Sequence, residues 1–257
     1  MSIAPGTDLY QCAQIVERGD PERFASVMAA PVPAREVLFP LYAFNIEVSR
    51  APWVTSEPMI AQMRLQWWWD ALEEIRAGAV VRRHEVVTPL AALLDAESAA
   101  ILQELVEARR LDVEHSPFDD EPALWAYLQA TASGLVHVAS RCLGADNAEQ
   151  ARLFGRAAGL AAYVRAVPER EARGRQPLPD GRPGTLAALA RQGLEDLRNA
   201  RRSSVGPSRA AFGGAPAAAW VLRRVARAPG SVAAGQLTPP EAMLRLSRVW
   251  TGLTGRW

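Results

Sequence analysis

The chain has 257 residues, of which 49% are hydrophobic and 22% charged, a balance that is typical of a globular protein with an apolar core and excludes a disordered chain or a small disulfide-rich domain. Its 29 basic and 28 acidic residues leave a net charge of +1, so no overall field attracts nucleic acid and we expect no nucleic-acid partner. No apolar run reaches the roughly 18 residues of a membrane-spanning helix.

Helical signals run through almost the whole chain, and we predict one all-α domain over residues 1–257. Alanine and leucine dominate, and runs of alternating β-branched residues are scarce. The predicted helices cover residues 8–18, 20–30, 33–51, 56–78, 86–109, 121–143, 147–166, 184–201, 215–227 and 239–255.

Local signals place several helix ends and loops. Asp20 before Pro21 is a typical N-cap, and Asp146 with Glu149 has the spacing of a capping box. Residues 202–216, which are rich in Ser, Gly, Pro and Arg, predict a flexible loop. The charged stretch 168–183 also loses helical periodicity, so it is either the mouth of a functional site or a plain solvated loop.

The first residues lack the basic start and apolar core of a secretory signal, so we expect a cytoplasmic protein. Cys12 and Cys142 lie far apart in the sequence, and in a reducing compartment they predict two buried thiols. All the basic residues are arginine, which excludes lysine Schiff-base chemistry.

Acidic and histidine clusters give no familiar catalytic motif. Asp70 and Glu74 have the spacing of a magnesium clamp, but they lie opposite the apolar face of their helix, so we expect a solvated pair. Asp119 and Asp120 precede Pro122 and indicate a helix start. The three histidines lack metal-ligand spacing and are His84, His115 and His137.

Four segments resemble the squalene/phytoene synthase family in order and spacing. They are LFPLYAFNIEVSRAP (38–52), RLQWWWDALEEIRAG (64–78), ARRLD (108–112) and GRAAGLAAYVRAVPEREARGRQPLP (155–179). The resemblance implies an isoprenoid synthase fold, a single helical bundle around a central cavity. It also implies head-to-head condensation of two prenyl diphosphates, assisted by Mg²⁺ that two aspartate-rich motifs hold.

The chain departs from the family at both motifs. The aspartates of the first motif are replaced by Ser49, Arg50 and Trp53, and Glu47 is an acid out of register. In the second motif Ala166 and Arg170 stand in place of aspartate. A Mg²⁺ site depends on each of its few carboxylates. We therefore expect no metal cofactor and no condensation of farnesyl or geranylgeranyl diphosphate; Mg²⁺ is expected only if the chain is active.

The replaced motifs have their own resemblance. Residues 44–47 (Phe-Asn-Ile-Glu) and 165–168 (Arg-Ala-Val-Pro) are similar to the mitochondrial respiratory complex I assembly factor that belongs to this family. This implies a non-catalytic assembly factor or scaffold with subunits of complex I as partners. Two alternatives stay open: an active head-to-head prenyltransferase and a prenyl-lipid-binding protein.

The resemblance also marks a residual pocket where the family binds substrate. Arginine can grip phosphate without a metal, so a prenyl diphosphate or a phospholipid headgroup is an expected ligand. The expected pocket residues are Tyr42, Asn45, Glu47, Arg165, Glu169, Arg173 and Arg175.

Near the end of the chain, apolar residues recur at steps of three and four beside arginines. An interfacial helix has this composition, and it predicts peripheral contact with the inner membrane. The alternative is that the stripe packs on the bundle; an accessible Trp257 distinguishes the first reading. The stripe is Met243, Leu246, Trp250, Leu253 and Trp257, and the arginines are Arg245, Arg248 and Arg256.

Overall fold

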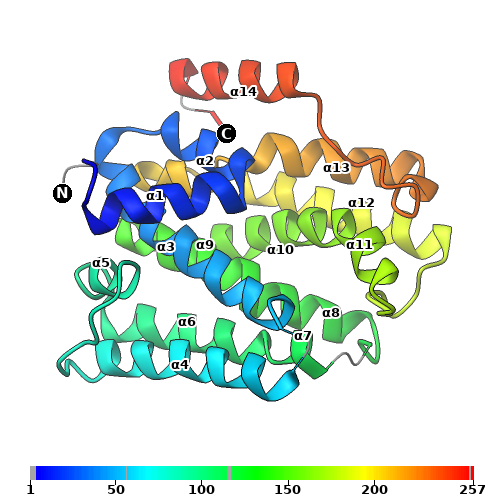
Figure 1. Cartoon of the computed structure of the whole chain (residues 1–257). Coiled ribbons are helices and arrows are strands. Elements are labelled where there is room, and N and C mark those ends of the chain that lie inside the picture. The colour runs from blue at the N-terminus through cyan, green and yellow to red at the C-terminus, as the bar shows by residue number, and fades with distance from the viewer. Residues whose placement is uncertain (1–3, 56, 115–116, 255) are drawn as a thin grey trace.

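The computed structural model describes residues 4–55, 57–114, 117–254 and 256–257, and their regular elements are helical (Figure 1). The α-helices are α1 (Asp8–Gly19), α2 (Pro21–Met28), α3 (Val32–Arg50), α4 (Pro58–Arg76), α5 (Val87–Ala91), α6 (Ala96–Ala108), α7 (Leu111–Glu114), α8 (Glu121–Leu128), α9 (Gly134–Cys142), α10 (Ala148–Arg165), α11 (Val167–Ala172), α12 (Pro183–Ala200), α13 (Ala215–Arg227) and α14 (Glu241–Thr254). Short helices of other types are η1 (Ala51–Trp53), η2 (Gln129–Ser133), η3 (Gly206–Phe212) and η4 (Pro229–Ser231).

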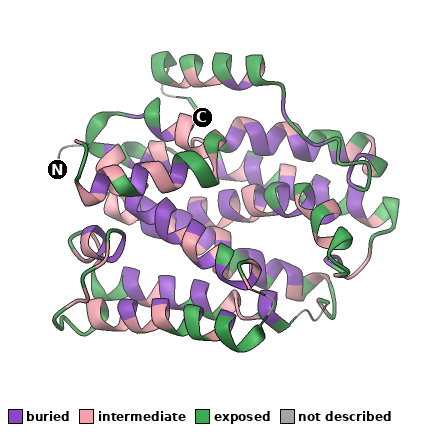
Figure 2. Ribbon diagram, viewed as in Figure 1, coloured by how far each residue is buried: buried purple, intermediate pink, exposed green. Residues whose placement is uncertain are grey.

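Helix α10 lies at the centre of the bundle and packs against α9, η2, α12 and α13. Helices α4 and α6 pair along one edge, and α14 lies along the opposite edge (Figure 1). Buried residues gather on the inner faces of the helices (Figure 2), where they form a continuous apolar core. The all-α prediction is confirmed.

Several local predictions are confirmed by the hydrogen bonds. Asp20 caps α2, where its Oδ1 accepts from the amide of Arg23 at 2.9 Å. Asp120 caps α8 by accepting from the amide of Ala123 at 2.8 Å. Each bond satisfies a backbone donor that has no partner inside the helix.

Two local predictions are wrong. The helix predicted over 86–109 is divided into α5 and α6, because Asp95 caps α6 by accepting from the amide of Ser98 at 2.8 Å. The N-cap of α10 is Asn147, not Asp146. Asp146 instead pairs with His137 at 2.8 Å and with Arg141, because both side chains lie within reach of its carboxylate.

The predicted loops contain short helices. Residues 206–212 form η3, and α11 (Val167–Ala172) overlaps the start of the stretch 168–183. Pro168 is in the first turn of α11, a position that tolerates proline because its amide would have no helical partner. The proline thus separates α11 from α10.

The helix predicted over 121–143 contains a π-turn, η2, between α8 and α9. Helix α10 approaches this turn closely at Gly155, where a Cβ atom would lie 2.3 Å from the Cα of Ser133. The hydroxyl of Ser133 donates to the carbonyl of Arg152 on α10 at 2.8 Å. The absence of a side chain at Gly155 therefore permits the contact between the two helices.

Both cysteines are free thiols; Cys12 is fully buried and Cys142 is half-buried. Burial is the main cause that raises the pKa of Cys12 to about 12 and that of Cys142 to about 11. Both thiols therefore stay protonated and unreactive near neutral pH.

None of the described helices is long and apolar enough to cross a bilayer.

Candidate functional site

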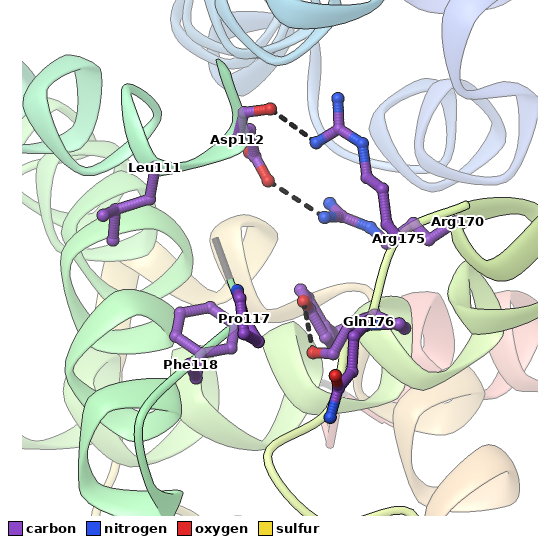
Figure 3. Close-up of a pocket in the computed structure, with 9 residues that line it drawn as sticks. Leu111, Asp112, Pro117, Phe118, Arg170, Arg175 and Gln176 are labelled. Carbon is purple, nitrogen blue, oxygen red and sulfur yellow. Dashed lines mark hydrogen bonds and ion pairs between the residues drawn. The ribbon is translucent and has the colours of Figure 1, made fainter. Parts of the chain in front are cut away.

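A buried charge cluster lies where α7, α8 and the segment after α10 meet. We call it the Asp112 cluster, and its members are Arg109, Asp112, Tyr127, Arg170 and Arg175. Figure 3 shows Arg170 and Arg175 reaching toward Asp112 from the opposite wall of a small pocket. The side chain of Asp112 is 5% exposed and that of Arg170 is 13% exposed.

Both oxygens of the Asp112 carboxylate are occupied. Oδ1 accepts from Nη1 of Arg170 at 2.9 Å. Oδ2 accepts from Nη1 of Arg109 at 3.2 Å and from the hydroxyl of Tyr127 at 2.7 Å. The guanidinium of Arg175 donates to the backbone carbonyl of Asp112. The carboxylate thus serves as the shared anion for cations from two separate segments of the chain.

The charges of the cluster shift its ionisation equilibria. Burial by itself would raise the pKa of Asp112, but the guanidinium groups of Arg109 and Arg170 outweigh burial and hold that pKa below its usual range. Burial raises the pKa of Tyr163, beside the cluster, to about 12. Burial, together with the charges of Arg170 and Arg173, lowers the pKa of Arg175. The cluster therefore holds an ionised carboxylate and an excess of positive charge at neutral pH.

Trp53 adds an aromatic surface to this cluster. The guanidinium carbons of Arg170, Arg173 and Arg175 lie 5.2, 4.9 and 3.8 Å from its ring centroid, within the range of cation–π attraction. By the family resemblance, Trp53 stands in place of an aspartate of the first motif, and Arg170 stands in place of an aspartate of the second. The two motif regions therefore do meet in space, and an indole–guanidinium contact joins them.

The pocket at the cluster is small. Its volume is about 50 Å³, whereas sites for small organic ligands usually measure about 300–1,000 Å³. The hydroxyl of Tyr163 donates to the carbonyl of Pro177 at 2.7 Å and ties the segment after α11 across the pocket. The pocket is lined by Leu111, Asp112, Pro117, Phe118, Tyr163, Arg170, Arg175, Gln176 and Pro177.

The residues predicted for the pocket are divided between two places. Arg173 and Arg175 lie at the cluster beside Trp53, and Glu169 pairs with Arg173 at 2.7 Å on the exposed surface of α11. Glu169 therefore neutralises an arginine and lies outside the small pocket.

The other predicted residues lie on α3 or near α2. Tyr42 is buried under the guanidinium of Arg23, 4.7 Å from its ring centroid, and Arg165 pairs with Glu22 at 3.1 Å. Asn45 and Glu47 are half-buried on α3, and their side chains make no hydrogen bond or ion pair with the residues that the structure describes.

The carboxylates that the structure places do not fit a magnesium cluster. In the described ranges, no three His, Cys, Asp or Glu side chains gather in a group that could hold a metal. Asp112 already binds two arginines and a tyrosine, which leaves it poorly suited to share Mg²⁺. Asp70 accepts from Gln66 at 2.7 Å and Glu74 accepts from Arg82 at 3.0 Å, so that pair forms no magnesium clamp.

The histidines have structural partners or lie beyond the described ranges. The ring of His84 lies 5.1 Å from Trp67 and 5.4 Å from Trp68, and His137 pairs with Asp146 at 2.8 Å. His115 lies outside the described residues.

The residues predicted for the site include Arg175 of this cluster but not Arg109, Asp112, Tyr127 or Arg170. The segment ARRLD (108–112) carries part of the family resemblance, and its aspartate is Asp112. The sequence does carry a signal for Asp112. This aspartate follows Arg109 and Arg110 at the end of an apolar helical segment. An acid in that position is a candidate for a buried ion pair.

Comparisons with known proteins agree on one family. The family whose description is squalene/phytoene synthase matches residues 16–181, more than half of the chain. Complex I assembly factor 6 of Bos taurus is 26% identical over 193 residues, 68% of this chain and 54% of that protein. The Drosophila melanogaster homolog is 31% identical over 177 residues, 63% of this chain and 52% of that protein. The chain thus spans about half the length of these relatives.

The structure is similar to a crystal structure of a dehydrosqualene synthase in complex with a ligand. The TM-score is 0.69, and the match covers 84% of each chain at 16% sequence identity. This similarity shows the isoprenoid synthase fold.

Proposed function

The chain belongs to the squalene/phytoene synthase family, and from that premise we propose that it acts without catalysis, as an assembly factor or scaffold for respiratory complex I. The observation that carries the proposal is the contact of Trp53 with Arg170, whose guanidinium is paired with Asp112. The family resemblance implies an aspartate at each of these two positions, Trp53 and Arg170.

The replacement removes what the reaction of the family requires. The resemblance implies Mg²⁺ ions that neutralise the departing diphosphate, and these ions need several carboxylates in one place. Losing one group that stabilises developing charge lowers a rate by about 10²–10³-fold. The cluster offers one carboxylate, engaged by arginines, and a pocket of about 50 Å³. We infer that this chain does not condense prenyl diphosphates.

The assembly role rests on the relatives. Proteins from Bos taurus, Drosophila melanogaster and Homo sapiens that match this chain carry the name complex I assembly factor 6. The matches cover 63–68% of this chain, and the family match includes Asp112, Arg170 and Arg175. Subunits of complex I are therefore the proposed partners.

Two measurements test the two halves of the proposal. Purified chain is incubated with farnesyl or geranylgeranyl diphosphate and Mg²⁺ or Mn²⁺, and we expect no squalene, presqualene diphosphate or phytoene above a no-protein control. The tagged chain is then captured from its host after mild cross-linking, and we expect subunits of complex I to be enriched over a tagged unrelated protein. Product formation would disprove the first half, and capture without those subunits would disprove the second.

The excess of arginine favours a second candidate, binding of a phosphate-bearing lipid headgroup without metal. Arg173 and Arg175 lie at the edge of the cluster and carry donors suited to phosphate oxygens. Titration calorimetry with a non-hydrolysable prenyl diphosphate in EDTA would show heat that Arg175→Ala removes and Arg182→Ala, in an exposed ion pair with Asp180, retains. Absence of heat would reject this candidate.

A further inference from the structure

We propose that α14 binds the surface of an anionic membrane as an interfacial helix, with its apolar face directed away from the bundle. The observation is an inverted amphipathic pattern. Leu246, Val249, Trp250 and Leu253 are 71%, 60%, 58% and 81% exposed. They recur at steps of three, one and three residues, which places them on one face of the helix.

The opposite face of α14 is the more polar one, yet it faces the protein. Ser247 and Thr251 are partly buried there, and Leu244 is the buried apolar residue of the helix. A helix that served only to cover the core would place its apolar stripe inward. Figure 1 shows α14 along the edge of the bundle, and Figure 2 shows its outer side largely exposed. The fold therefore presents the stripe to the surroundings.

Contacts at both ends hold α14 in this orientation. Near its start, Leu244 is 9% exposed, and the helix contacts α13. After its end, Trp257 packs against Phe154 and Phe212, with ring centroids 5.7 and 4.7 Å apart. Trp257 is thus half-buried because the chain folds back onto the bundle, so the prediction of an accessible Trp257 is wrong and the proposal rests on the four exposed residues of α14 instead. The exposed apolar face of α14 is therefore held in place by contacts on both sides of the helix.

The charges beside the stripe fit anionic lipid. Residues 241–257 contain three arginines and one acid, Glu241, and Glu241 already pairs with Arg245. Next to Trp257, the guanidinium of Arg201 lies 5.6 Å from the ring centroid. Burial, together with the nearby charge of Arg223, lowers the pKa of Arg201. Arg245 and Arg256 are exposed, whereas Arg248 is half-buried on the side of Leu244; the exposed arginines near the apolar stripe favour a negatively charged interface.

Size and charge argue against a protein occupant. A stable interface buries about 800 Å² per partner and uses about 20–30 residues on each side, whereas the stripe offers four large apolar side chains. Pairing with a second copy would also bring together two helices that each carry two arginines and one acid. An interfacial helix needs only its apolar face and the neighbouring positive charge.

The test is co-sedimentation of the full chain with vesicles of phosphatidylcholine alone or mixed with phosphatidylglycerol. We expect binding to the anionic vesicles that falls at least about tenfold for Trp250→Ser/Leu253→Ser, and that weakens at about 1 M salt, where the Debye length is about 3 Å. The matched control, Met59→Ser/Met63→Ser, alters side chains of α4 that are 75% and 65% exposed and retains wild-type binding. All four substituted side chains are exposed, so folding is expected to persist, and circular dichroism checks this.

Three results would overturn the proposal. One is that neither the wild type nor the variant binds vesicles. Another is that Trp250→Ser/Leu253→Ser binds as well as the wild type and the Met59→Ser/Met63→Ser control. The third is a concentration-dependent dimer in sedimentation velocity that this variant abolishes while vesicle binding is absent, which would assign the stripe to self-association.

Discussion

Asp112 shares its carboxylate between Arg109 and Arg170, and all three side chains are at most 15% exposed. Leaving a buried charge without its partner costs more than the pair itself contributes, about 3–5 kcal/mol in typical cases. We therefore expect Asp112→Asn to destabilise the fold by about this amount, because two guanidinium groups lose their counterion. Urea unfolding measures the change. The control is Asp119→Asn, because Asp119 is exposed. Equal losses of unfolding free energy in the two variants would contradict the buried pairing of Asp112.

The same carboxylate predicts a pH dependence. The pKa of Asp112 is lower in the folded protein than the usual unfolded value of about 3.9. Its contribution to stability is therefore complete above about pH 5 and is lost as pH falls through the folded pKa. The difference in unfolding free energy between the wild type and Asp112→Asn should narrow below about pH 4. A difference that stays constant down to pH 2 would mean that Asp112 is not the titrating partner.

At the scale of the element, the contact between α10 and η2 depends on Gly155. A Cβ there would lie 2.3 Å from the Cα and 2.7 Å from the amide nitrogen of Ser133, and backbone atoms cannot move aside as a flexible side chain can. We expect Gly155→Ala to cost about 1–3 kcal/mol or more. Gly184→Ala, in the first turn of α12 with no atom within 4 Å, should be neutral or slightly stabilising. Thermal unfolding of both variants separates the effect of packing from that of helix propensity.

The sequence predicted which side chains are buried wherever the helical period alone determines the buried face. The apolar face of α4 predicted opposite Asp70 and Glu74 is buried at Leu65, Trp68 and Leu72. The sequence did not predict the break between α5 and α6, because periodicity continues across a capping residue such as Asp95. Nor did it place the carboxylate of Asp146, whose partners, His137 and Arg141, lie on the preceding helix.

At the scale of the whole molecule, the family resemblance predicted the fold and the meeting of the two motif regions. The resemblance did not predict the side chains that lie where the two motif regions meet, which are Trp53, Asp112 and the arginines that contact them. Trp53 and Asp112 are 59 residues apart in numbering, and both contact arginines that follow α10. Contacts between residues so far apart in the sequence depend on tertiary packing. The spacing of motifs along the chain does not determine them. For the same reason the prediction that Tyr42 and Arg165 line the pocket is wrong: their side chains contact Arg23 and Glu22 of α2.

We propose that this chain assists the assembly of complex I and does not act as a synthase. The most direct test deletes the gene in its host and measures assembled complex I on native gels, together with NADH-dependent ubiquinone reduction. We expect a loss of assembled complex I that the wild-type gene restores, while the host's prenyl products stay unchanged. Normal complex I in the deletion strain, together with loss of a squalene- or phytoene-type product, would contradict it.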